Sequence, residues 1–350
     1  MNLSNRQCLH YARDVEKSDP SGASASPRIS VAICTRNGAA FVAEQLRSIY
    51  AQTRLPHEIV VSDDDSSDGT VAIAREAIGH DGSDGVSVRF ITNPSALGVT
   101  KNFEQAIRAC TGDLIALSDQ DDSWHPNRIE VMADAFSSAP RTELMFSNAR
   151  LVDADGKPLG ESLFDGLEIS RADRDQLRAG DAFPVLMKRN LVTGATVMIR
   201  RSLAERAMPF PAAWVHDEWL GIVASTTVGV GLIDDMLIDY RQHASNEIGA
   251  GSLSLAEKFG RLAEEGSDRN ARLLARARVL SQRFEAIAPP IAEKYRTAAR
   301  AKLAHEEART ALPVSRIRRI GPLLREWRTG RYTRYGRGGA DILRDLVQPR

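Results

Sequence analysis

The sequence predicts an α/β fold in which a mostly parallel sheet is flanked by helices and followed by a C-terminal helical extension. Short β-rich runs alternate with amphipathic helical stretches as far as residue 117, which is typical of parallel sheets covered by helices, and residues 143–241 then form a mixed region of strands, a turn and a helix. Residues 253–310 instead carry apolar side chains at helical spacing, with a break at Pro289-Pro290. We therefore expect a flexible N-terminal segment (1–27), an α/β domain (28–250) and a helical C-terminal region with a basic amphipathic tail (251–350).

The expected strands and helices follow each other in a regular order. After the first strand, apolar residues such as Phe41, Leu46 and Ile49 recur at helical spacing, and later stretches repeat this pattern. Because ligands of such sheets bind beyond the carboxyl ends of the strands, polar clusters that follow strands are the candidate site residues. We predict helices over 41–50, 71–78, 99–110 and 218–225. We predict strands over 30–34, 58–62, 86–92, 114–117, 143–148, 196–200, 228–233 and 237–240.

The composition fits a chain with a sizeable core and argues against a polyanionic partner. Hydrophobic residues make up 43% of the 350 residues, and 46 basic side chains balance 46 acidic ones, so we expect no nucleic acid partner. The cysteines Cys8, Cys34 and Cys110 are odd in number and widely spaced. This pattern predicts reduced thiols rather than a disulfide or a zinc site.

The beginning of the chain shows no targeting pattern. Residues 1–20 lack the apolar core of a signal peptide, and no run in the chain reaches the ~18 apolar residues of a membrane span. Residues 18–27 are rich in Ser, Ala and Pro, and such a segment cannot bury enough surface to order itself. These patterns predict a cytoplasmic protein with a flexible lead-in.

A first acidic cluster, Ser62-Asp63-Asp64-Asp65-Ser66-Ser67-Asp68-Gly69, directly follows the strand predicted over 58–62. These residue types favour turns and helix N-caps, so the cluster can simply begin the next helix. Alternatively, one of its carboxylates accepts hydrogen bonds from the imide of a uracil or thymine ring or from ribose hydroxyls.

A second cluster, Ser118-Asp119-Gln120-Asp121-Asp122-Ser123-Trp124, follows the apolar strand predicted over 114–117. Three carboxylates this close repel one another, and a bound hard cation such as Mg²⁺ or Mn²⁺ explains the cost best. A solvated acidic turn is the alternative. The flanking Leu117 and Trp124 favour the cation site, because they indicate a loop held against the core.

A third cluster, His216-Asp217-Glu218-Trp219, opens the helix predicted over 218–225. Asp217 can cap this helix and complement its dipole, which requires no catalytic role. Taken alone, the cluster therefore favours a structural interpretation.

The order and spacing of the three clusters resemble the family 2 glycosyltransferases of the GT-A fold, especially rhamnosyltransferase-like members of bacterial polysaccharide pathways. The resemblance covers roughly residues 30–247. It departs at Asp65, where the family usually has Gly, so the backbone of this turn is expected to differ. The motifs that carry the resemblance are Val31-Ala32-Ile33-Cys34-Thr35-Arg36-Asn37-Gly38, the turn over 63–70, Asn93 with Gly98 and Asn102-Phe103, residues 112–122, Thr193-Gly194-Ala195, His216-Asp217-Glu218-Trp219, and Tyr240-Arg241-Gln242-His243 with Asn246.

The resemblance implies roles for individual residues. Asp121 would bind a divalent metal, Mg²⁺ or Mn²⁺, together with the late histidine His243, and Arg241 lies close enough in sequence to assist. Asp217 would be the catalytic base that takes the proton of the acceptor hydroxyl, with inversion at the anomeric carbon. The nucleotide-sugar would be held by Thr35, Arg36, Asn37, Asp63 or Asp64, Asp119 and Gly194.

The implied activity is an inverting, metal-dependent glycosyl transfer in bacterial surface polysaccharide synthesis, such as O-antigen synthesis. A sugar would pass from a nucleoside-diphosphate donor to a hydroxyl of a glycan or of a polyprenyl-diphosphate-linked acceptor. The donor stays open among dTDP-rhamnose, UDP-hexoses and GDP-sugars. Two other functions are weaker. A sugar nucleotidyltransferase would need a better signature loop than Thr35-Arg36-Asn37-Gly38, and a non-catalytic nucleotide-sugar-binding module would not need the carboxylates of all three clusters.

The C-terminal tail is strongly basic. Residues 314–350 carry ten arginines and three acids, interleaved with apolar and aromatic residues. This combination suits the headgroup region of an anionic bilayer, which would place the protein at the inner face of the cell membrane. The alternative is a solvated helix that packs on its own domain through its Leu and Trp residues.

Overall fold

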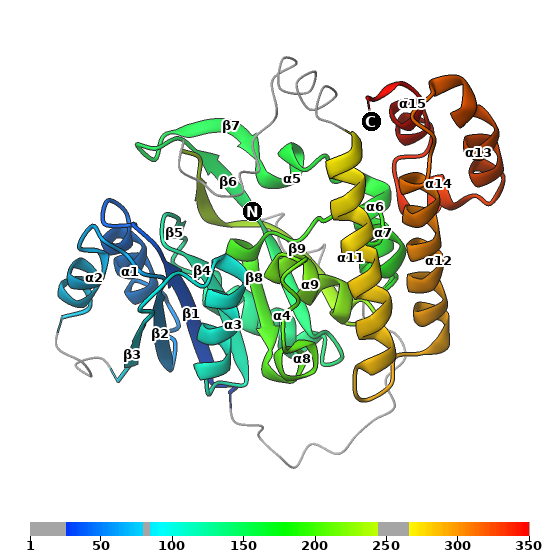
Figure 1. The fold of residues 1–350 in the computed structure, drawn as a ribbon. Helices are drawn as coiled ribbons and strands as arrows, with labels where there is room; N and C mark the ends of the chain where they lie inside the picture. The colour runs from blue at the N-terminus through cyan, green and yellow to red at the C-terminus, as the bar shows by residue number, and fades with distance from the viewer. Residues whose placement is uncertain (1–25, 80–84, 244–265, 350) are drawn as a thin grey trace, which may run out of the picture.

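The computed structural model describes residues 26–79, 85–243 and 266–349. Within these ranges a nine-stranded sheet forms the centre, and helices pack against it, with a group of C-terminal helices beside it (Figure 1). The strand order is β3-β2-β1-β4-β8-β6-β9-β5, and β7 pairs with β6 outside this path. The predicted α/β class with a helical C-terminal extension is confirmed.

The first half of the sheet is parallel, as the alternation of strands and helices predicts. Its strands are β1 (Ile29–Thr35), β2 (Glu58–Asp63), β3 (Ser87–Thr92) and β4 (Leu114–Asp119), and the connecting helices are α1 (Val42–Tyr50), α2 (Thr70–Ile78) and α3 (Val99–Ala109). The register pairs Thr35 with Asp63 and Cys34 with Asp119. The carboxyl ends of β1, β2 and β4 therefore meet at one edge, which brings the first two acidic clusters together.

The second half of the sheet contains both parallel and antiparallel strand pairs. Between β4 and β6 lies β8, which is antiparallel to both, whereas β9 is parallel to β6. Two strands were predicted over 228–233 and 237–240, but β9 runs through both. The pairing of β9 with β6 shifts in register between Ile233 and Met236, so Asp234 and Asp235 lie at an irregularity within one strand. The strands of this half are β5 (Ser123–Trp124), β6 (Leu144–Val152), β7 (Pro158–Ser162), β8 (Val197–Arg200) and β9 (Val230–Arg241).

Each face of the sheet buries its own apolar cluster. Along β1, Val31 and Ile33 pack with Leu46 on one face, whereas Ala32 packs with Phe103 on the other. Successive strand side chains point to opposite faces, and helices cover both, so the strand is buried along its whole length and apolar between Ser30 and Thr35. The remaining helices of this part are α4 (Arg128–Ser138), α5 (Leu163–Gly166), α6 (Arg171–Arg178), α7 (Phe183–Leu186), α8 (Arg201–Ala207) and α9 (His216–Ala224).

The C-terminal region is helical throughout its described part. The predicted break at Pro289-Pro290 separates the first two helices, which pack side by side (Figure 1). Leu280 and Phe284 of the first helix join the cluster on one face of the sheet. None of the described helices is long and apolar enough to cross a membrane. The helices are α11 (Gly266–Ala286), α12 (Glu293–Thr310), α13 (Arg316–Arg328), α14 (Arg331–Tyr335) and α15 (Gly339–Val347).

Some sequence predictions concern residues outside the described ranges. They are most of the flexible segment over 1–27, Cys8, Asn246 and the first apolar positions of the helical region. The two described cysteines, Cys34 and Cys110, are buried free thiols.

Candidate active site

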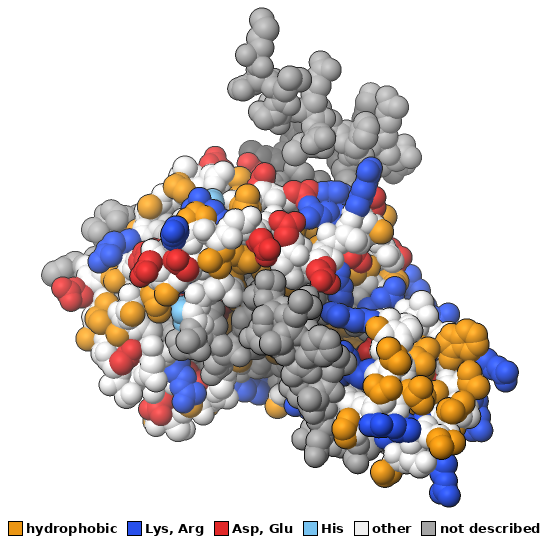
Figure 2. All heavy atoms as spheres, turned by 90° about the horizontal axis from the view of Figure 1, so that it is seen from above, with side chains coloured by type: hydrophobic (Ala, Val, Ile, Leu, Met, Phe, Trp, Pro, Cys, Tyr) orange, Lys and Arg blue, Asp and Glu red, His pale blue; other side chains and the backbone are white. Residues whose placement is uncertain are grey.

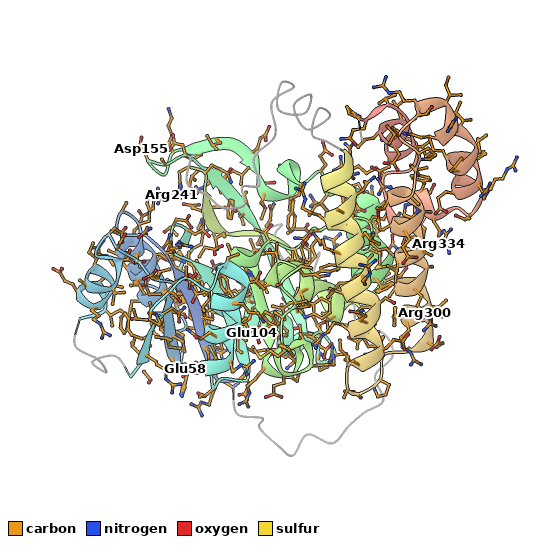
Figure 3. All side chains as sticks on the ribbon, in the orientation of Figure 1. Glu58, Glu104, Asp155, Arg241, Arg300 and Arg334 are labelled. Carbon is orange, nitrogen blue, oxygen red and sulfur yellow. The ribbon has the colours of Figure 1, made fainter. Side chains whose placement is uncertain are left out.

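The polar clusters converge on one cavity of about 710 Å³. Figure 3 labels Glu58, which begins β2, at the bottom and Arg241, which ends β9, near the top. The carboxyl ends of the parallel strands therefore lie on the upper side, where the loops that line the cavity begin. Nine of the ten predicted site residues line this cavity: Thr35, Arg36, Asn37, Asp64, Asp119, Asp121, Gly194, Asp217 and His243.

Asp63 is the predicted residue that does not line the cavity. Its carboxylate accepts hydrogen bonds from Oγ1 of Thr35 at 2.7 Å and from the hydroxyl and backbone amide of Ser66. These bonds fasten the end of β1 to the first acidic turn. Of the two carboxylates that were candidates for the nucleotide, Asp64 therefore occupies the cavity wall and Asp63 supports it.

Asp64 is held by donors from the loop before α3. Its oxygens accept from the backbone amides of Leu97 at 2.7 Å and Gly98 at 2.9 Å, and from the side-chain amide of Asn93 at 3.0 Å. Asn102 in turn hydrogen-bonds Ser62 at the end of β2. The polar residues around 93–102 thus fix the orientation of the Asp64 carboxylate.

Asp65, which stands where the family usually has Gly, lies at a left-handed position of the backbone. Asp65 has a φ of 64°, in the left-handed region, where glycine fits without cost. Asp and Asn tolerate this region better than other residues with a Cβ. The turn therefore keeps the conformation that glycine would favour.

Two loops at this edge are joined by Gln120. Its side-chain amide accepts from the backbone N–H of Arg36 at 2.8 Å and donates to the Arg36 carbonyl at 2.9 Å. The same amide fills the space beside Gly38, where a Cβ would meet Oε1 at 2.0 Å. The loop after β1 and the acidic loop after β4 therefore form one connected wall of the cavity.

The acidic loop is crowded and largely removed from water. Burial, followed by the charges of Asp121 and Asp217, raises the pKa of Asp119 to about 8. Burial and the charge of Asp121 also raise the pKa of Asp122, whose Oδ2 has no hydrogen-bond partner among the described residues. Without a counter-charge these carboxyls favour their protonated form, and a bound cation would stabilise the charged form.

Two arginines that the sequence analysis did not assign as counter-charges stabilise this loop. Arg128 of α4 is fully buried and lies over the ring of Trp124, 3.8 Å from its centroid. Burial lowers the pKa of Arg128 to about 9, although Asp122 and Asp119 act in the opposite direction. Arg241 donates to the carbonyl of Asp121 at 2.8 Å and does not line the cavity, so its role is to hold the loop.

The predicted metal ligands lie next to each other. Nε2 of His243 is 2.8 Å from Oδ2 of Asp121, and the His243 ring stacks on Phe41. The described residues hold no group of three or more His, Cys, Asp or Glu arranged around one point. Mg²⁺ and related ions commonly take one or two protein ligands together with substrate phosphates. A carboxylate and an imidazole facing a cavity fit a metal of this kind.

Asp217 lines the same cavity, at the start of α9. Its Oδ2 accepts a 2.8 Å hydrogen bond from the backbone amide of Gly194. Burial, followed by the charge of Glu218, raises the pKa of Asp217 to about 7. The adjacent His216 ring stacks on Phe103 at 3.9 Å, and burial lowers its pKa to about 3, so it is neutral. Asp217 is therefore a carboxylate that can take up a proton near neutral pH.

The C-terminal region contributes to the cavity, which the sequence analysis missed. Arg276 of α11 lines the wall next to Asp217, forms a 2.6 Å ion pair with Glu218 and lies over the ring of Trp214. No motif marks Arg276, since it is one of many arginines in a helical stretch. Its position could be predicted only by knowing that α11 packs against α9.

Comparisons with known proteins agree with the fold. A Staphylococcus aureus TarS structure (residues 1–349, with UDP-GlcNAc) superposes with a TM-score of 0.54 at 15% identity, over 85% of this chain and 80% of that chain. This likeness shows the GT-A type of fold. An uncharacterized glycosyltransferase of Nostoc sp. is 26% identical over 63% of this chain. The match spans 66% of the Nostoc protein, just under two thirds of its length.

Two further matches show the family. Residues 30–161 match the family described as Glycosyl transferase family 2. The dTDP-rhamnosyl transferase RfbG of Shigella flexneri is 30% identical over 247 residues, which cover 66% of this chain and 78% of RfbG. The chain with its paired acidic clusters at the carboxyl edge of the sheet thus belongs to glycosyl transferase family 2.

Proposed function

We propose that the protein is an inverting, metal-dependent glycosyltransferase that moves a sugar from a nucleoside-diphosphate donor to an acceptor hydroxyl. The observation that carries this proposal is one cavity whose wall includes both Asp217 and the adjacent pair of Asp121 and His243. One carboxylate is thus available for the acceptor proton, while a second site is available for the diphosphate.

The donor would lie along the edge of the parallel strands. Thr35, Arg36 and Asn37 follow β1 and would contact the nucleotide, while Asp64 would accept from the base. Asp119 would approach the ribose, and Gly194 would leave room for the sugar where donor and acceptor meet.

The metal would be held by Asp121 and His243. A divalent cation neutralises the charge that develops on a diphosphate leaving group, and it stabilises the transition state in this way. The excess of buried carboxylates around Asp119 and Asp122 makes such a cation favourable here.

Asp217 would act as the base. As the acceptor oxygen forms its bond to the anomeric carbon, the bond from that carbon to the diphosphate oxygen breaks, and Asp217 takes the hydroxyl proton. The attack comes from the face opposite the phosphate, so the configuration inverts. The Gly194 amide stabilises the charged form of Asp217, and burial keeps the carboxylate basic.

The substrates are part of the same proposal. The relative RfbG is a dTDP-rhamnosyl transferase, which supports dTDP-rhamnose as the first donor to test, with UDP-hexoses and GDP-sugars next. The acceptor would be a glycan or a polyprenyl-diphosphate-linked glycan of bacterial surface polysaccharide synthesis, such as O-antigen. Such an acceptor places the reaction in the cytoplasm, at the inner face of the cell membrane.

The two other functions are less well supported. A non-catalytic nucleotide-sugar-binding module has no need for a buried carboxylate with a pKa of about 7 beside the sugar position. A nucleotidyltransferase would attack phosphorus, and its signature loop is missing from the sequence after β1.

The test is a screen of nucleotide-sugars with Mg²⁺ or Mn²⁺, in which hydrolysis or transfer is followed by release of the nucleoside diphosphate. The proposal expects turnover of one donor class, loss of turnover in EDTA and recovery when the metal is restored. Product nuclear magnetic resonance with a donor that turns over should show inverted configuration. Nucleotide-sugar binding without any turnover, with donor and acceptor mixtures, would support the binding module instead.

A further inference from the structure

The C-terminal helices expose an unusual number of large apolar side chains. Ile317 is 81% exposed and Trp327 is 55% exposed, although both lie in regular helices of a folded region. Figure 2 shows these side chains gathered into one patch over the C-terminal helices, with basic side chains along its rim. We call this surface the tail patch. It consists of Val314, Ile317, Ile320, Leu324, Trp327, Leu343 and Val347.

Acidic and basic side chains of the same region differ in their exposure to solvent. All three acids between residues 311 and 349 are buried, namely Glu326, Asp341 and Asp345. They pair inward, for example Glu326 with His305 at 2.6 Å and Asp345 with Arg309 at 2.7 Å. The exposed charges of this stretch are all arginines: Arg316, Arg318, Arg325, Arg328, Arg334 and Arg337.

The packing of α13 explains how the patch is presented. Arg319, Leu323 and Glu326 are buried, at a spacing that places them on one face of the helix. Arg319 donates to backbone carbonyls at both ends of the tail, including that of Pro313 at 2.7 Å and that of Gln348 at 2.7 Å. These contacts fix the inner face of α13, so Ile317 and Leu324 remain on the outer face.

We propose that the tail patch docks the protein on an anionic lipid bilayer, with its apolar side chains in the interfacial region and its arginines on lipid headgroup phosphates. Exposed apolar surface together with a basic rim is the pattern of peripheral membrane binding, and Trp327 suits the boundary between water and acyl chains. The inner side of the C-terminal helices thus packs on α12, while their outer side offers a face for the bilayer. Packing on the chain's own domain and binding to a membrane, the two alternatives for the tail, are therefore compatible.

Other occupants fit the surface less well. A second copy of the chain would bring two rims of arginine together, which repel each other. A polyanion such as nucleic acid would satisfy the arginines but leave the apolar centre in water. A bilayer with anionic headgroups satisfies both parts of the surface.

The tail patch and the loops of the cavity lie on the same side of the molecule, which fits a reaction at a membrane surface. Figure 2 views the molecule from the side at which the parallel strands end, and the tail patch is visible in this view. The loops that line the cavity begin on the same side of the sheet. A bilayer at the tail patch would therefore lie on the side of the molecule from which a membrane-anchored acceptor reaches the site. The docking itself goes beyond the proposed transfer reaction, because it requires neither donor nor acceptor.

The experiment is sedimentation of the full-length protein with vesicles made of equal parts phosphatidylcholine and phosphatidylglycerol, and with vesicles of phosphatidylcholine alone. We expect binding to the anionic vesicles that falls as salt is added, because salt screens the arginines. The triple variant Arg316→Gln, Arg318→Gln, Arg325→Gln should bind on the order of a hundredfold more weakly, since each arginine near the surface contributes about fivefold. The matched control replaces three exposed arginines on other helices, Arg47→Gln, Arg171→Gln and Arg201→Gln, and should bind like the unchanged protein.

A second variant tests the apolar part. Ile317→Ser, Leu324→Ser and Leu343→Ser together should weaken binding at least about tenfold, because their apolar area no longer enters the bilayer. The control is Leu55→Ser, Leu159→Ser and Met236→Ser, which are exposed elsewhere. Circular dichroism checks that every variant is folded, which is expected because all substituted side chains are exposed.

Tryptophan fluorescence gives an independent measurement. Trp124, Trp214 and Trp219 are buried, and Trp327 is the exposed tryptophan. Anionic vesicles should shift the emission to shorter wavelength, and Trp327→Phe should remove the shift while vesicle sedimentation persists.

Three results would overturn the docking proposal. They are no binding to anionic vesicles, equal binding by the tail-patch variants and their controls, and a tail-patch-dependent dimer that forms without any vesicle binding. A failed donor screen would leave this proposal untouched, because the vesicle assay contains no nucleotide-sugar.

Discussion

The backbone amide of Gly194 lies 2.8 Å from Oδ2 of Asp217, and a Cβ on Gly194 would come within 2.7 Å of Nε2 of His216. The absence of a side chain at residue 194 thus allows the chain before β8 to approach the start of α9. This close approach gives Asp217 a hydrogen bond to its charged form inside a site that otherwise favours the neutral form. Four predictions concern these residues and the others that shape the site.

Replacing Asp217 with Asn should remove the base and keep its size. We expect the transfer rate to fall about 10²- to 10⁴-fold, while donor affinity hardly changes, because the proposal assigns donor binding to other residues than Asp217. Steady-state rates and titration calorimetry with the donor measure the two effects. Glu218→Gln is the neighbouring control. A rate for Asp217→Asn above about a tenth of the unchanged rate would assign the base elsewhere, with Glu218 as the next candidate.

The rate should depend on pH through the same group. The pKa of Asp217 is raised to about 7, and the base must be deprotonated to act. Activity should therefore be full above pH 7 and fall about tenfold for each pH unit below it, because the deprotonated fraction falls in that proportion. The pH profile of kcat/KM measures this group in the free enzyme. A profile that is flat between pH 5 and 7 would contradict the assignment.

Gly194→Ala should misplace the base without removing it. The added methyl group must push the His216 ring aside, which disturbs the start of α9 next to Asp217, and a small displacement of a catalytic group costs on the order of 10²-fold in rate. Overpacking should also lower the free energy of unfolding by about 1–3 kcal/mol. The control is Gly321→Ala in α13, where a Cβ meets no atom within 4 Å. That change should leave the rate unchanged and raise the melting temperature.

Metal removal should abolish transfer and weaken nucleoside-diphosphate binding. Asp121→Ala and His243→Ala should each reduce Mn²⁺-dependent binding of the nucleotide, because each removes one of the two adjacent ligands. Both variants should stay folded. For Asp121→Ala the reason is that removing one of several repelling carboxylates does not destabilise the apo protein. Calorimetric titration of UDP or dTDP with and without Mn²⁺ measures the effect. Full activity in EDTA would exclude the proposed metal.

Asp345→Ala should be strongly destabilising although it lies far from the cavity. Asp345 pairs with the buried Arg309 and accepts from the hydroxyl of Tyr332 at 2.9 Å. Its loss removes both hydrogen bonds from Asp345 to the buried Arg309 guanidinium, which still pairs with Glu306 at 3.1 Å, and breaking a buried ion pair in this way costs about 3–5 kcal/mol. Denaturant unfolding measures the loss, and Asp235→Ala, at an exposed position, is the control expected to be near neutral. Equal stability of the two variants would show that the inward ion pairs do not hold the tail.

The sequence predicted the first half of the fold and most of the cavity wall because both follow from strand ends. Apolar runs followed by polar clusters mark the carboxyl ends of parallel strands, and the register then brings residues as distant as Thr35 and Asp119 to one edge. The sequence could not decide between Asp63 and Asp64. Adjacent residues at a strand end point in opposite directions, and which one faces the cavity depends on the neighbouring loops.

Other features could not be predicted because their signals are tertiary. The strand β9 contains Asp234 and Asp235, whose polarity breaks the apolar pattern, yet it pairs along nearly its whole length with β6. The short helices between β7 and β8 have too few residues for periodicity to be recognised. Arg319 looks like any tail arginine, and only its five backbone acceptors distinguish it from the exposed ones.

The position of Arg276 bears on how relatives of this protein can be recombined. The matched family region ends at residue 161, yet α11 supplies part of the wall beside Asp217. A chimaera that joins residues 26–243 of this chain to the helices of another family member would therefore inherit a foreign surface next to the acceptor. Exchange of the helices alone should alter acceptor choice while donor choice stays with the parent, which makes the C-terminal helices a separable module for engineering selectivity.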